Sequence, residues 1–99
     1  MNATLVAAAL ALAAVAAHAQ DNPVARSLAA TCASCHGTEG RSVTQEVASL
    51  AGLPKEHIVA QMKAFRDGTR PATVMQQLAK GYSDAQIELL ADYFSRRTR

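Results

Sequence analysis

The chain has 99 residues, of which 18% are charged, and its formal net charge is +2 at pH 7. Basic and acidic residues are mixed along the chain, so it lacks the clustered basic patch expected of a nucleic-acid-binding protein. A chain of this length holds one domain with a small hydrophobic core, and such a domain commonly needs a cofactor or a covalent staple for stability.

The first segment of the chain has the pattern of a cleavable export signal. Residues 1–17 carry no charged side chain and consist mainly of alanine, leucine and valine. Ala17-His18-Ala19 is a small-x-small tripeptide of the kind that signal peptidases cleave, and polar residues follow it. The apolar run is shorter than the roughly 20 residues that a membrane-spanning helix needs. We therefore predict a secretory signal peptide at residues 1–19, cleaved near Ala19, and one domain at residues 20–99 without a membrane span.

The first half of this domain begins with a helix and continues into a long loop. Asn22 and Pro23 are typical of a cap and a first helical position, and the helix they begin is expected to run towards Thr31. Residues 37–52 are polar, contain glycines and have no sustained period, which predicts a loop. A second helix is expected over residues 55–66, because apolar residues recur there on one helical face: Ile58, Met62 and Phe65.

The second half adds a short helix and a long one. Residues 69–73 predict another loop, after which Val74 and Met75 begin a short helical turn that Gly81 closes. Residues 83–86 form a capping box before the last helix, where apolar residues recur at helical spacing: Ile87, Leu90, Ala91 and Phe94. The predicted fold class is all-α, with three main helices plus one short helix, and the small apolar faces indicate that a further group fills the interior.

Both cysteines lie in one stretch, TCASCHG, directly before a histidine. A thioredoxin-like dithiol shares the CxxC spacing but lies near a βαβ pattern, and this chain shows no strands. A structural zinc site needs four ligands, and no second Cys/His pair exists, because His57 stands alone and His18 belongs to the predicted signal. CxxCH is also the attachment motif of c-type haem.

The haem interpretation explains the spacing of the motif best. Two thiols separated by two residues reach the two vinyl groups on one side of the porphyrin, and the next residue then lies beneath the iron. We therefore predict one covalently attached haem c, with thioethers at Cys32 and Cys35 and with His36 as the proximal axial ligand of the iron.

An electron-carrying haem iron usually takes a second axial ligand, and methionine is the common partner of histidine in c-type cytochromes. Met62 lies on an apolar helical stripe, which favours a packed core residue. Met75 follows a proline-bearing loop well after the motif, so the chain can reach the opposite haem face. We predict Met75 as the distal axial ligand; a bis-histidine site with His57 and a purely structural Met75 are the alternatives.

Three stretches together resemble the class I c-type cytochromes of bacterial periplasmic type: CASCHG, MKAFRDGTRPATVMQQLAKGYSDAQI and ADYF. The chain is similar in particular to c553/c4-like cytochromes and to the cytochrome subunit of flavocytochrome c sulfide dehydrogenase. In those proteins an F-x-x-G segment, a short loop, the ligand methionine and an A-K-G-Y-S-like segment follow one another. The matching residues here are Phe65, Gly68, Met75, Ala79, Lys80, Gly81, Tyr82 and Ser83.

The resemblance implies a class I cytochrome c fold in which the first and last helices cross and the others close around the haem. Residues expected at the crossing are Leu28, Ile87, Leu90 and Phe94, and residues expected in the haem pocket are Ile58, Met62 and Phe65. Many relatives carry a proline after the motif, next to the carbonyl that orients the ligating imidazole. Residues 44–49 contain no proline, so the sequence does not identify which carbonyl serves His36.

The resemblance also implies a periplasmic carrier of single electrons, without catalysis of its own, that docks to other redox proteins. One alternative is the electron-accepting subunit of a flavoprotein sulfide dehydrogenase, and another is a free shuttle to a terminal oxidase or reductase. A third, a haem sensor or peroxidase with an open iron site, requires that Met75 does not bind the iron. Small neutral residues such as Ala33, Ser34 and Gln77 predict a weak docking surface.

Overall fold

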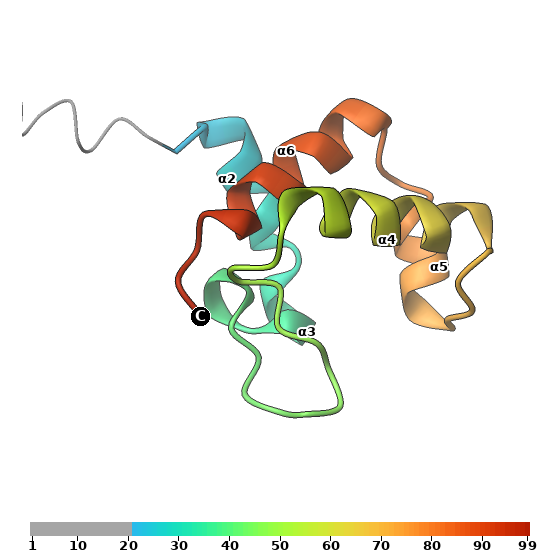
Figure 1. The fold of residues 1–99 in the computed structure, drawn as a ribbon, viewed down its shortest axis with the longest axis horizontal. Coiled ribbons are helices and arrows are strands. Elements are labelled where there is room, and N and C mark those ends of the chain that lie inside the picture. Colours follow the sequence, from blue (N-terminus) through green and yellow to red (C-terminus); the bar gives the residue numbers. More distant parts are fainter. Residues whose placement is uncertain (1–20) are drawn as a thin grey trace, which may run out of the picture.

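The computed structural model describes residues 21–99, and this part of the chain is helical without any strand (Figure 1). Its elements are α2 (Pro23–Ala30), α3 (Ala33–His36), the 3-10 turn η1 (Thr38–Gly40), α4 (Lys55–Asp67), α5 (Val74–Ala79) and α6 (Asp84–Ser95). The all-α prediction is confirmed, with α3 as an additional helical turn over the cysteine motif. The predicted signal peptide at 1–19 lies outside the described residues. Within residues 21–99, no helix has the length and apolar character needed to cross a membrane.

The helix boundaries follow from capping groups that the sequence contains. The Asn22 side chain accepts hydrogen bonds from the backbone N–H groups of Val24, at 2.9 Å, and Ala25, at 3.2 Å, and thereby begins α2. The predicted capping box of α6 is present. Gln86 N–H donates to Ser83 Oγ at 3.2 Å, and Ser83 N–H donates to Gln86 Oε1 at 3.0 Å.

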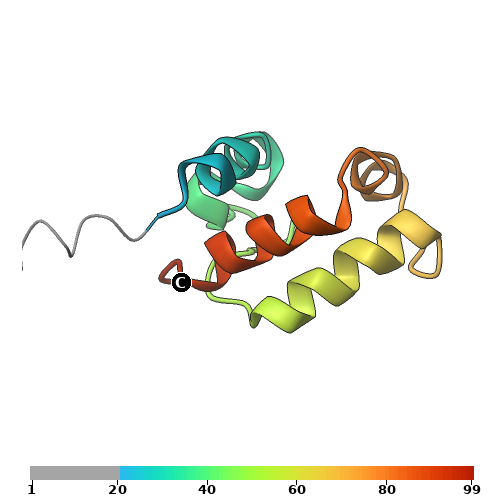
Figure 2. The same cartoon turned by 90° about the horizontal axis from the view of Figure 1, so that it is seen from above.

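Helices α4 and α6 each pack against two other helices of the domain. Helix α6 packs against α2 on one side and against α4 on the other, and α5 packs against α4 (Figure 2). As predicted, the first and last long helices are neighbours. Helices α3 and α5 both extend below α4 and α6 in Figure 1, with α5 at the right end and α3 nearer the middle of the molecule.

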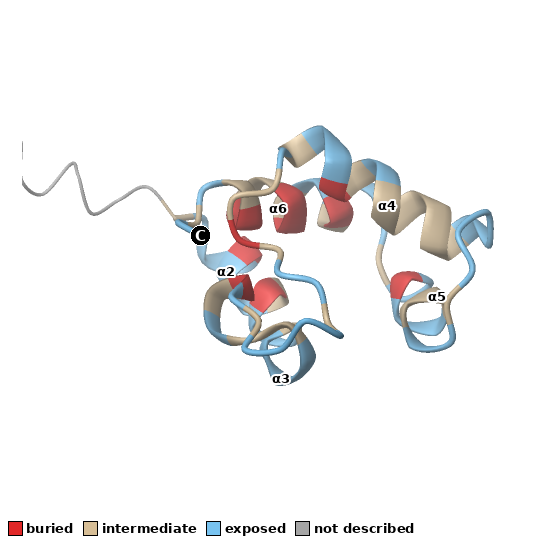
Figure 3. Cartoon of the chain, turned by 60° about the horizontal axis from the view of Figure 1, so that its bottom comes forward, coloured by how far each residue is buried: buried red, intermediate tan, exposed pale blue. Residues whose placement is uncertain are grey.

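The core is narrow because half of its buried apolar residues are alanines: Ala25, Ala29, Ala51, Ala79 and Ala91. The larger buried side chains lie on α4 and α6 (Figure 3): Ile58, Ile87, Leu90, Tyr93 and Phe94. Ile58 belongs to the buried cluster between the helices, and its predicted place beside the haem stays a prediction. Leu28, predicted at the helix crossing, is half-buried at the edge of that cluster.

The two ends of the described chain are joined by an ion pair. The Arg97 guanidinium donates hydrogen bonds to both carboxylate oxygens of Asp21, one of them at 3.1 Å. It also lies 4.3 Å from the ring centroid of Tyr93. Hydrogen bonding to Arg97 lowers the pKa of Asp21, and its positive charge adds to the effect.

Replacing Asp21 by Asn is expected to lower the thermal unfolding midpoint of the holoprotein at pH 7. Because the pKa of Asp21 is lower in the folded chain than in the unfolded one, the carboxylate stabilises the fold above its unfolded pKa. That stabilisation disappears as the pH falls through the folded pKa, so the variant and the wild type should converge in acid. Asp92→Asn, which removes a more exposed pair with Arg96, is the matched control and should have the smaller effect. A gap between Asp21→Asn and wild type that stayed constant down to strongly acidic pH would contradict the assignment.

Candidate haem site

The cysteine motif lies where α2 ends and a single helical turn begins. Cys32 is the N-cap of α3 and Cys35 lies within it, so the two thiols are three positions apart on one turn and share a side of it. Cys32 is half-buried against the core, Cys35 is exposed, and neither forms a disulfide. Both sulfurs are therefore available on the same side of the turn.

The environment of the motif favours neither zinc nor a reactive dithiol. Burial raises the pKa of the Cys32 thiol, whereas zinc binding and thiol exchange both need the thiolate. Among residues 21–99, no three His, Cys, Asp or Glu side chains gather as a metal-ligand group. His57 is exposed in the first turn of α4.

The His36 imidazole is oriented by a backbone carbonyl. Its Nδ1 lies 2.6 Å from the carbonyl oxygen of Ala48. A carbonyl can only accept, so Nδ1 carries the proton and Nε2 keeps its lone pair, the arrangement usual for a metal-ligating histidine. The prolines of related loops are absent here, and Ala48 supplies the carbonyl that the sequence could not identify.

The loop that carries Ala48 is closed at its base by Gly40. The N–H groups of Leu50 and Ala51 both donate to the Gly40 carbonyl, at 2.8 and 3.1 Å. Gly40 has φ +77°, and a Cβ there would lie 2.8 Å from a ring carbon of Phe94 on α6. The loop thus closes only because a residue without a side chain fits between it and α6.

Met75 is the second residue of α5 and is half-buried. Two apolar neighbours on the same helix are largely exposed, Val74 at 59% and Leu78 at 51%. They lie four positions apart and therefore share one face, which residues 21–99 leave largely uncovered. Met62 instead packs against the core cluster, in agreement with its predicted structural role.

The predicted ligands therefore lie on two separate elements. His36 belongs to α3 and Met75 to α5, and these helices stand apart on the same side of the domain (Figures 1 and 3). No hydrogen bond or core contact joins the two residues directly. Two thiols, an imidazole with a free Nε2, a thioether and an uncovered apolar face are together the donor set and surface that haem c needs.

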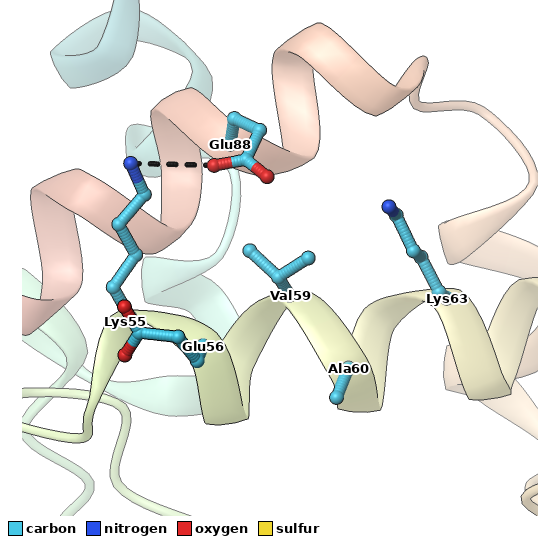
Figure 4. A pocket seen from close by; sticks show the side chains of 6 residues that line it. All are labelled: Lys55, Glu56, Val59, Ala60, Lys63 and Glu88. Carbon is cyan, nitrogen blue, oxygen red and sulfur yellow. Dashed lines mark ion pairs between the residues drawn. The ribbon is translucent and has the colours of Figure 1, made fainter.

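A shallow groove of about 470 Å³ between α4 and α6 is a different feature (Figure 4). Its lining residues are Lys55, Glu56, Val59, Ala60, Lys63 and Glu88. An ion pair between Lys55 and Glu88, at 3.2 Å, crosses it. It contains none of the predicted ligands.

Comparison with known proteins agrees with this geometry. The family model of cytochrome c matches residues 23–96, which include the motif, both predicted axial ligands and every helix described in residues 21–99. The chain belongs to the cytochrome c family. It is a class I cytochrome with one haem-attachment motif, and its cofactor is covalently attached haem c.

Three relatives illustrate the range of this family. The cytochrome subunit of sulfide dehydrogenase from Chlorobaculum tepidum is 42% identical over 67 residues, which cover 68% of this chain and 60% of the relative. The thiosulfate dehydrogenase electron acceptor of Thiomonas intermedia is 41% identical, over 69% of this chain and 32% of the relative. A solved cytochrome c4 from Acidithiobacillus ferrooxidans is 29% identical with a TM-score of 0.66, over 79% of this chain and 52% of that one. The chain thus spans a third to three fifths of these relatives' lengths.

The contact between Gly40 and Phe94 can be tested with a matched pair of glycine variants. Gly40→Ala is expected to destabilise the holoprotein by about 2–4 kcal/mol, because a left-handed backbone strain is added to overpacking against the ring. Gly68→Ala has a similar φ of +79° but meets only a flexible glutamine side chain at 3.4 Å, so it should cost about 1 kcal/mol. Urea unfolding of both variants measures the difference, and equal losses would show that the ring contact is unimportant.

Proposed function

We propose that this cytochrome c carries single electrons through a haem whose iron is held by His36 Nε2 on one side and Met75 Sδ on the other. Cys32 and Cys35 anchor the haem. The observation that carries this proposal is the hydrogen bond from His36 Nδ1 to the Ala48 carbonyl, which leaves Nε2 free to bind a metal.

Each residue has a defined part in this function. The Cys32 and Cys35 thiols would hold the haem covalently through two thioether bonds. The Ala48 carbonyl keeps the His36 imidazole in one tautomer and orientation. When bound, haem c takes up and releases one electron at its iron. The neutral Met75 thioether favours the less charged, reduced state, so the reduction potential should be positive.

The cellular setting follows from the amino-terminal sequence and from the chemistry of attachment. A signal peptide at residues 1–19, with the cytochrome domain at residues 20–99, would export the chain, and in bacteria this type of haem is attached outside the cytoplasm. We accordingly place the working protein in the periplasm.

The names of two relatives favour a dehydrogenase as the partner that supplies electrons to this carrier. One is named as a subunit of sulfide dehydrogenase and another as the electron acceptor of thiosulfate dehydrogenase. We propose that the chain is the electron-accepting, non-catalytic subunit of a flavoprotein sulfide dehydrogenase; a free shuttle to a terminal oxidase or reductase is the alternative. The exposed residues Ala33 and Ser34 on α3 and Val74 and Gln77 on α5 offer a small uncharged surface for docking.

The distal ligand is tested by exchanging each methionine in turn. Met75→Ala should abolish the far-red absorption band of the oxidised holoprotein that is typical of methionine bound to ferric iron, and it should lower the reduction potential. Met62→Leu, a change of similar volume in the core, should leave the band intact. Absence of the band from the wild type would instead support the open iron site of a sensor or peroxidase, and loss in Met62→Leu alone would exchange the roles of the two methionines.

The partner is tested by purifying the tagged protein from its native cells. We expect a flavin-containing chain to elute with it in a fixed ratio, and sulfide to reduce the haem of that complex. Elution at both low and high salt is the control, because a weak charge-steered encounter is lost at high ionic strength whereas a permanent subunit is retained. A haem protein that elutes alone under both conditions, and is reduced only by diffusing donors, would favour the free shuttle.

A further inference from the structure

One side-chain hydrogen bond connects the segment before the motif with the segment after α5. Tyr82 Oη lies 3.1 Å from Thr31 Oγ1, although the two residues are 51 positions apart. Thr31 is the C-cap of α2 and directly precedes Cys32. Tyr82 lies between the end of α5, the helix of Met75, and the beginning of α6.

The direction of this bond follows from the second partner of the threonine. The Thr31 hydroxyl donates its single proton to the Leu28 carbonyl at 2.8 Å. It must therefore accept from Tyr82, whose hydroxyl is the donor. The tyrosine ring is half-buried and packs against the same core cluster as Leu28 and Cys32, so the hydroxyl is held in place by its ring.

No other hydrogen bond joins residues 21–52 to residues 54–90. The remaining bonds from the first of these segments to the carboxyl-terminal part of the chain reach only the end of α6 and beyond. They are Gly52 N–H to Phe94 O, Arg97 to Asp21, Arg41 to Thr98 O and Arg99 to Gly52 O. The far end of the domain, where α5 packs on α4, thus has a single polar connection to the segment that carries the motif.

We propose that Tyr82 is a positioning residue, whose hydrogen bond to Thr31 fixes the methionine-bearing end of the domain relative to the haem-attachment turn. The inference rests on the proposed ligation by Met75. Without the Tyr82 hydroxyl, the segment between α5 and α6 loses its hydrogen bond to Thr31, the residue before Cys32. The Met75 sulfur then leaves its bound position more readily, and a competing ligand replaces it at lower concentration.

The test is competition by imidazole at the ferric iron of the purified holoprotein, followed by loss of the far-red band. Tyr82→Phe removes only the donor, whereas Thr31→Val removes the acceptor together with the bond from Thr31 to the Leu28 carbonyl. Each should lower the imidazole concentration for half-displacement by about two- to tenfold, the effect of one net hydrogen bond. The double variant should be no weaker than Thr31→Val, because Tyr82 acts only through its bond to Thr31. The reduction potential should fall in the same variants, since a weaker thioether bond favours the reduced iron less.

Tyr93→Phe is the matched control, because it removes the same atom from the other tyrosine. The Tyr93 hydroxyl makes no hydrogen bond within residues 21–99, so imidazole competition should match the wild type. Equal shifts in Tyr82→Phe and Tyr93→Phe, or no shift in Tyr82→Phe while the wild type shows the band, would overturn the positioning role and leave the proposed function intact. A wild type without the band would refute Met75 ligation, and with it this inference.

Discussion

The packing of small side chains between α2 and α6 is the constraint on which the rest of the structure depends. Ala25 and Ala29 are buried with Ala91 in the cluster between these helices, and alanine allows two helix axes to approach closely. The same alanines leave little apolar surface to bury, because an alanine side chain has far less apolar area than a leucine or a phenylalanine. A domain with so narrow a core commonly needs a cofactor for stability, so haem is expected to contribute to the fold as well as to the function.

The helix pair also determines how His36, the proposed iron ligand, is oriented. The Phe94 ring on α6 lies against Gly40, the Gly40 carbonyl closes the loop, and Ala48 in that loop holds the imidazole of His36. A side chain in the core is therefore connected to the tautomer of a ligand through three consecutive contacts. Changes at the end of α6 are accordingly expected to alter the orientation of the His36 imidazole.

Much of this arrangement could be read from residue types, and the rest depends on contacts between distant segments. The caps at Asn22 and Ser83 and the CxxCH motif are local signals, because the interacting groups are a few residues apart. The choice of Ala48 as acceptor was not predictable, since every residue of the loop has a carbonyl and only the folded path selects one. The helical spacing of Ile58 shows that its face is buried but not which neighbours bury it, so its place in the core cluster was not predictable.

The ion pair between Asp21 and Arg97 brings the two ends of the described chain together on one side of the domain. In Figure 1 this side lies at the left, whereas α5 lies at the right. A linker fused near Asp21 or near Arg97 would attach the molecule to a surface by the same side. Helix α5, which contains Met75, would then point away from that surface. On an electrode, such a one-sided attachment would give a uniformly oriented layer of the protein.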